Sequence, residues 1–175
     1  MKVLQAIKSF IIGTIGVAYF AFALVMTVLL LSYNDYGVTQ IGSKSLIIIN
    51  DEVSNEKYDK GDLVIVERTL VKKLKPEDEI FTYRVDSKGI PHIQIGNIET
   101  VYEEENAIAF KNGENYGYDF IAGKAVKKYS GWGTFLSIVE SQWGFLFIVL
   151  VPCFLIFIYE LYSLIIEIKY GADED

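Results

Sequence analysis

The chain has 175 residues, and 23 acidic against 16 basic side chains give it a formal net charge of −7. No basic stripe is present, which excludes nucleic acid as the expected partner. One cysteine and one histidine, with no glycine-rich phosphate loop and no metal-ligand spacing, predict no disulfide, no metal site and no cofactor.

The first long apolar segment runs from residue 10 to residue 31 without a charged side chain. As a helix with about 1.5 Å of rise per residue it spans roughly 33 Å, against ~30 Å for the hydrocarbon core of a bilayer. A cleavable signal sequence has a shorter apolar region and a small-x-small site, whereas this segment ends in Val28-Leu29-Leu30-Leu31-Ser32. We therefore expect a cytoplasmic tail over 1–9 and an uncleaved transmembrane helix over 10–32.

The middle of the chain alternates short β-type runs with turn signals and has no long stretch of helical periodicity. Six strands are expected, at residues 46–49, 63–66, 80–85, 93–101, 107–111 and 120–126. Strands without helices between them predict a folded, mostly antiparallel, barrel-like sheet. We assign residues 33–130 to one extracytoplasmic β domain, whose size suits a single hydrophobic core.

Residues 131–142 are open to two interpretations. Trp132, Phe135, Leu136 and Val139 recur at helical spacing with polar residues between them. This pattern is typical of an interfacial amphipathic segment, and a tryptophan suits the headgroup region. The same spacing is equally consistent with an early start of the second apolar segment.

The second apolar segment runs from Trp143 to Tyr159 and is interrupted by Pro152. Because apolar residues continue past Glu160, we expect a transmembrane helix over 143–166, followed by an acidic cytoplasmic tail over 167–175. A glutamate at this depth would lie near a membrane boundary, where it can reach the headgroups or face a helix of another membrane protein.

The orientation follows from the basic residues beside the first apolar segment. Lys2 and Lys8 precede it, whereas residues 33–43 after it contain no lysine or arginine. The positive-inside rule then places both ends in the cytoplasm and the β domain outside a cell membrane that is crossed twice. Three lysines shortly before the second segment oppose this assignment.

Several landmarks of the middle domain follow one another in a recognisable order. They are Gly42, the apolar strand 46–49, residues 50–55, Gly61-Asp62, Glu77 to Arg84, Pro91 to Ile95, Asn112 to Asn115 and Ile121 to Val126. This order resembles the membrane-anchored type I signal peptidases, in the branch shared by archaea, the endoplasmic reticulum and some spore-forming bacteria. The resemblance covers about residues 42–126 and both apolar segments, and it implies the folded antiparallel sheet of that family.

In that family a serine attacks the scissile carbonyl, a histidine takes its proton, and an aspartate orients the histidine. The resemblance places His92, the only histidine, at the base. It places Glu114 at the orienting acid, with Asp119 as an alternative carboxylate. His92 shares a strand face with Gln94, so an ordinary surface histidine is the competing interpretation.

The nucleophile position departs from the family pattern. The family spacing, counted from Gly42, places Glu52 where the serine is expected. Ser54 takes the position if the preceding strand is extended, and Ser45 takes it if a longer loop precedes Gly61. Glutamate would remove acyl-enzyme chemistry, because a carboxylate that attacks an amide forms a high-energy anhydride. Loss of a catalytic-triad serine costs on the order of 10⁶ in turnover.

Three functions follow from these residues. The preferred one is a signal-peptidase-like protein that engages secretory preproteins or their signal peptides at the outer membrane surface without cleavage, through a cleft for an extended peptide. The second is an active signal peptidase that uses Ser54 or Ser45 with His92 and Glu114. The third is a two-span scaffold or sensor with an unrelated binding surface, for which the lysines at 72–75 are the most obvious candidate.

Overall fold

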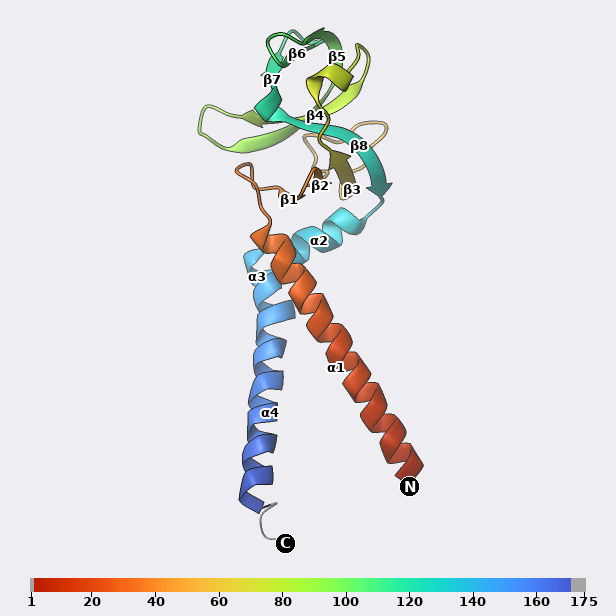
Figure 1. The fold of residues 1–175 in the computed structure, drawn as a ribbon, viewed down its shortest axis with the longest axis vertical. Helices are drawn as coiled ribbons and strands as arrows, with labels where there is room; N and C mark the ends of the chain where they lie inside the picture. Colours follow the sequence, from red (N-terminus) through yellow and green to blue (C-terminus); the bar gives the residue numbers. More distant parts are fainter. Residues whose placement is uncertain (1, 171–175) are drawn as a thin grey trace. The chain divides into compact units, whose positions relative to one another are not determined.

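The computed structural model describes residues 2–170, so the part of the predicted acidic tail from residue 171 onward lies outside the described residues. The chain divides into two units. The first unit combines Met1–Val28 with Ile138–Asp175, and the second unit is Leu29–Ser137. The first unit contains the long helices and the second contains the sheet (Figure 1).

The helical unit is built on two long apolar helices. Helix α1 covers Lys2–Leu31, so residues 2–9, predicted as a tail, are helical; no proline or glycine interrupts them. The second apolar stretch is made of α3 (Gln142–Phe145), the π-helical segment η3 (Leu146–Leu150) and α4 (Val151–Tyr170). Phe10–Leu31 and Gln142–Ile166 are long and apolar enough to cross a membrane, by length and composition.

Ser141 separates helix α2 (Trp132–Glu140) from α3. Its backbone is extended, with φ −65° and ψ 148°, and its hydroxyl oxygen accepts the N–H of Gly144 at 3.0 Å. A serine with this geometry is an N-cap, which satisfies a free N–H at the start of the helix that follows. Residues 132–140 are therefore a helix of their own and not an early start of the second apolar segment.

A hydroxyl from α1 completes the hydrogen bonding of the second apolar stretch. Pro152 has no N–H, so the carbonyl of Ile148, four residues earlier, lacks its α-helical donor. The Tyr19 hydroxyl lies 2.7 Å from this carbonyl oxygen and 3.0 Å from that of Val149. The π-helical segment η3, which lies just before Pro152, is thus hydrogen-bonded to Tyr19 of α1.

The second unit is one curled sheet of eight antiparallel strands, in the order β1-β2-β3-β8-β4-β5-β6-β7 (Figure 1). The strands are β1 (Thr39–Ile41), β2 (Lys44–Ile48), β3 (Leu63–Glu67), β4 (Glu79–Val85), β5 (Pro91–Tyr102), β6 (Ala107–Phe110), β7 (Asn115–Gly117) and β8 (Ile121–Tyr129). Short 3₁₀ turns occur at Val71–Lys73 (η1) and Tyr118–Phe120 (η2). The predicted antiparallel sheet between two long apolar helices is confirmed, and the chain as a whole is mixed α/β.

All six predicted strands are present, whereas β1 and β7 were not predicted. These two strands have three residues each, which is too short for an alternating pattern to be seen in the sequence. They pair with β2 and β6 at the two ends of the strand order. Their strand conformation therefore depends on a neighbouring strand and not on their own residues.

Strand β4 is buried on both faces because it lies between two hydrophobic clusters. Phe81 and Tyr83 belong to the first cluster, with Val64, Val66 and Ile47 among its members. Ile80 belongs to the second, together with residues of β5, β6 and β8. Alternate side chains of a strand point to opposite faces, so one strand serves both clusters. This buried strand holds β5, which carries the histidine.

Candidate functional site

The first half of β5 has an open edge. Strand β4 pairs with Pro91 to Asn97, whereas β6 pairs with β5 only from Ile98 onward. The Ile98 N–H donates to the carbonyl of Asp78, which directs the backbone groups of the even-numbered residues toward β4. The N–H and C=O groups of Ile93 and Ile95 therefore point away from β4, and no strand within residues 2–170 pairs with them.

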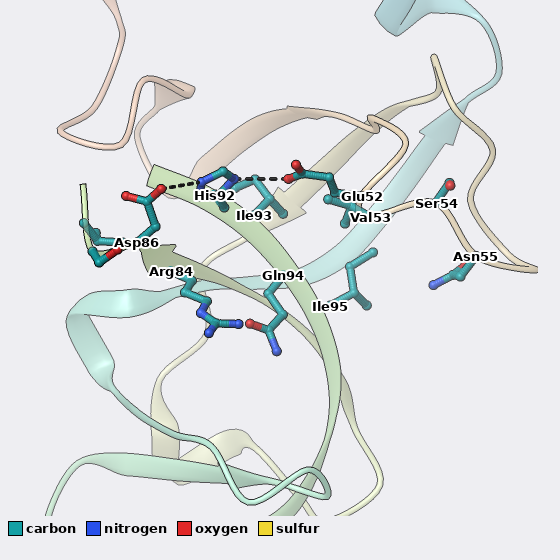
Figure 2. A pocket seen from close by; sticks show the side chains of 12 residues that line it. Glu52, Val53, Ser54, Asn55, Arg84, Asp86, His92, Ile93, Gln94 and Ile95 are labelled. Atoms are coloured by element: carbon teal, nitrogen blue, oxygen red, sulfur yellow. Dashed lines mark hydrogen bonds and ion pairs between the residues drawn. The ribbon is translucent and has the colours of Figure 1, made fainter. Parts of the chain in front are cut away.

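A groove of about 800 Å³ lies at this edge. One wall is the loop Glu52–Asn55, and the other is the β4–β5 hairpin, with residues 84–87 and 92–95 (Figure 2). The register of the hairpin places Arg84 opposite His92, so both side chains lie on one face of the sheet. The groove therefore contains charged side chains beside free main-chain groups.

His92 lies between two carboxylates. Its Nδ1 is 3.1 Å from Oε2 of Glu52, and its Nε2 is 3.5 Å from Oδ2 of Asp86. Figure 2 shows the two acids on opposite sides of the ring. A neutral imidazole donates through one nitrogen only, so only the doubly protonated ring can donate to both acids. The structure thus brings Glu52 and His92 together and adds Asp86, which the sequence analysis missed.

Asp86 is held in the turn of the hairpin. Its Oδ1 accepts the backbone N–H groups of Lys88 and Ile90, each at 2.8 Å. The pKa of the Asp86 carboxyl is below its usual value, and the hydrogen bond from Ile90 is the main cause. Desolvation raises this pKa, but the bonds from Ile90, Lys88 and His92 together outweigh it. An aspartate before Ser-Lys-Gly is a turn signal, and together with the β4–β5 register it would have placed this residue near His92.

Glu114, the predicted orienting acid, does not contact His92. Its side chain accepts hydrogen bonds from Gln94 at 2.5 Å, Asn112 at 2.8 Å and Tyr116 at 3.1 Å, and it lies 3.3 Å from Arg84. These bonds, that of Gln94 first, lower the pKa of the Glu114 carboxyl. Gln94 is two residues from His92 on the same strand, which is roughly 7 Å along β5. The prediction that Glu114 orients His92 is therefore wrong. Glu114 orients Gln94, and Asp86 is the carboxylate that lies beside the imidazole together with Glu52.

The alternative residues of the site bond elsewhere. The Ser54 hydroxyl donates to the carbonyl of Asp51 at 3.1 Å, although Ser54 also lines the groove. Ser45 is buried in β2, with its hydroxyl 3.2 Å from that of Tyr83. Asp119 is exposed and lies 3.6 Å from Arg68. None of these three side chains hydrogen-bonds or ion-pairs with His92, so neither serine is placed next to a base.

The arrangement can bind protons and cations, and it offers main-chain groups to an extended chain. Among residues 2–170, no three or more histidine, cysteine, aspartate or glutamate side chains are placed to hold a metal ion. The contacts of the imidazole in this part of the chain are carboxylates and not alcohols. In this geometry neither ring nitrogen of His92 has a serine hydroxyl as its hydrogen-bond partner among residues 2–170.

Comparisons of the chain with protein-family models, with curated proteins and with solved structures find no match.

Proposed function

We propose that this protein binds an extended peptide in the groove beside β5 without cleaving it, as a non-proteolytic relative of the type I signal peptidases. The observation that carries the proposal is the Glu52 carboxylate 3.1 Å from Nδ1 of His92. The resemblance to the signal peptidases assigns the Glu52 position to their nucleophilic serine. The site therefore has a base without a nucleophile.

The absence of cleavage follows from the chemistry of this pair. A serine becomes nucleophilic when a base takes its proton, whereas the Glu52 carboxylate has no proton to give and would form an anhydride with a peptide carbonyl. Both nitrogens of His92 face carboxylates, so the imidazole is engaged on both sides. We expect a peptide to stay intact in this groove.

The open edge of β5 supports peptide binding. The free N–H and C=O groups of Ile93 and Ile95 can accept one further strand, as in other proteins that bind peptides by adding a strand to a sheet. The groove next to this edge is within the usual volume range of ligand sites, about 300–1,000 Å³. Main-chain hydrogen bonds would then provide affinity for many sequences, as a receptor for diverse preproteins requires.

The two apolar helices support a membrane location. The lysines before the first of them favour an outer position of the β domain by the positive-inside rule. There the groove would meet secretory preproteins or their signal peptides as these leave the bilayer. Two spans in one chain, one before and one after the β domain in the sequence, would tether this domain to the membrane. The proposed role is to retain or present a secreted protein.

Incubation with a purified preprotein tests this function. The full-length protein in an uncharged detergent should crosslink to the preprotein through a photoreactive residue at Ile95, and mass spectrometry should show an uncut preprotein. A control with the photoreactive residue at Glu105, on the exposed turn between β5 and β6, should crosslink much less. Cleavage that disappears in Ser54→Ala, Ser45→Ala or His92→Ala would overturn the proposal and identify a protease.

A further inference from the structure

We infer that the groove prefers a peptide strand in which apolar residues alternate with lysine or arginine, with one cation bound at Glu52. This inference rests on the proposed peptide binding and adds the chemical class of the peptide. It follows from a difference between the two faces of β5 and from the balance of charge around His92.

The two faces of β5 at the groove differ in polarity. Ile93 and Ile95 pack against the first hydrophobic cluster, and Val53 of the opposite wall is buried. His92 and Gln94, at the alternate positions of the strand, belong to the other face, and the His92 imidazole meets Glu52 at 3.1 Å. A strand added at this edge would have the same two-residue period as β5. Every second side chain of the peptide would therefore lie on the apolar face, and the others would lie on the polar face.

The polar face carries an excess of negative charge. Glu52, Asp86 and Glu114 face Arg84 and His92, so three carboxylates oppose at most two cations even when the imidazole is protonated. Arg84 lies 3.3 Å from Glu114, which leaves Glu52 and Asp86 to share one imidazole. A basic side chain of the peptide would restore the balance of charge, whereas an acidic one would increase the excess.

Glu52 is the carboxylate best placed to receive the cation. Its side chain is 66% exposed, against 34% for Asp86, and it contacts His92 through Oε2. Both oxygens of Asp86 are engaged, one with backbone N–H groups and one with His92. A carboxylate can accept about four hydrogen bonds, so Oε1 of Glu52 can bind an ammonium or guanidinium group while Oε2 stays with His92.

The charge contributes selectivity, whereas the main chain contributes most of the affinity. An exposed ion pair is weak and is screened by salt, so we expect one basic residue to change the dissociation constant by about two- to fivefold at low ionic strength. The preference should decrease as salt is added. The binding of a neutral alternating peptide should change little with salt.

Fluorescence anisotropy with labelled seven-residue peptides tests the inference on the full-length protein in an uncharged detergent. The three peptides alternate lysine with valine, alternate serine with valine, or carry the lysine and valine residues in separate blocks. The lysine–valine alternation should bind best, and Glu52→Gln should abolish its advantage over the serine–valine peptide. Glu99→Gln, which removes an exposed acid of the same strand outside the groove, should leave the advantage unchanged.

The outcomes separate the two proposals. Equal binding of the lysine and serine peptides, or a lysine preference that persists in Glu52→Gln, would overturn the inference and leave peptide binding intact. Equal binding of the alternating and block peptides would overturn the two-faced arrangement. Failure of all three peptides to bind would overturn the proposed function itself. Thermal unfolding of both glutamine variants checks that each one is folded.

Discussion

Asp62 is a buried carboxylate that joins the start of β3 to the residues after β8. It accepts the backbone N–H groups of Asp59 at 3.1 Å and Gly131 at 3.3 Å, and it lies 3.2 Å from Nζ of Lys128. Burial by itself raises the pKa of Asp62, but the hydrogen bond from Lys128 and the two backbone bonds outweigh burial and hold the pKa below its usual value. The Gly-Asp pair noted in the sequence thus has a structural role.

The lowered pKa predicts how stability depends on pH. A carboxyl whose pKa is lower in the folded state stabilises the fold above its unfolded pKa of about 3.9, and this contribution is lost as the pH falls through the folded value. We expect Asp62→Asn to lower the free energy of unfolding at pH 7 by about 1–3 kcal/mol. Its stability should also decrease less steeply than that of the wild type below about pH 4.

Urea unfolding between pH 7 and pH 2 measures both effects. Asp59→Asn serves as the matched control, because Asp59 lies in the same loop with an exposed side chain. An Asp62→Asn variant with wild-type stability at pH 7 would show that the buried carboxylate is not a structural anchor.

The Tyr19 hydroxyl of α1 donates to the Ile148 carbonyl of the second apolar stretch, the carbonyl that Pro152 leaves without its α-helical donor. Removal of the Tyr19 hydroxyl takes away its hydrogen bond to the Ile148 carbonyl, and such a loss is costly when the surroundings are lipid. Hydrogen bonds between helices in membranes contribute about 0.5–2 kcal/mol. We expect Tyr19→Phe to weaken the helical unit by this amount, as measured by unfolding in micelles.

A double-mutant cycle tests the cause of that loss. Pro152→Ala restores an N–H that can donate to Ile148, so Tyr19→Phe should cost less in a Pro152→Ala background. Tyr159→Phe, which removes an exposed hydroxyl from α4, should have little effect. Additive effects of the Tyr19 and Pro152 substitutions would contradict the proposed pairing.

The predicted orientation of the whole chain can be tested with its single cysteine. Replacement of Cys153 by serine gives a cysteine-free background in which new cysteines report their side of the membrane. If both ends lie in the cytoplasm, Ser87→Cys in the β4–β5 turn should react with an impermeant maleimide added outside intact cells, and Lys2→Cys should react only after permeabilisation.

The reverse labelling pattern would place the β domain in the cytoplasm. In that arrangement the three lysines before the second apolar segment, and not the two at the N-terminus, would have decided the orientation. A groove on that side would not meet preproteins after they cross the membrane, so this result would also contradict the proposed function.

The structure brings some of the residues named from the sequence together and separates others, because the interactions differ in how far they reach along the chain. His92 and Gln94 belong to one face of a strand, which the alternation of the sequence predicts. Glu114 was assigned to His92 although it reaches Gln94, because spacing along a sequence does not determine a register across two further strands. Asp86 was missed because its position depends on the pairing of Arg84 with His92.

Residue types and their periodicity alone determined the two long apolar helices and the six principal strands. These features arise from local burial patterns, which each segment carries by itself. Only the tertiary structure decided that Glu52 faces His92, that Asp86 takes the other nitrogen, and that β5 has an open edge. Each of these depends on contacts between segments distant in the chain, whose geometry is set by strand register and loop packing and not by any one segment.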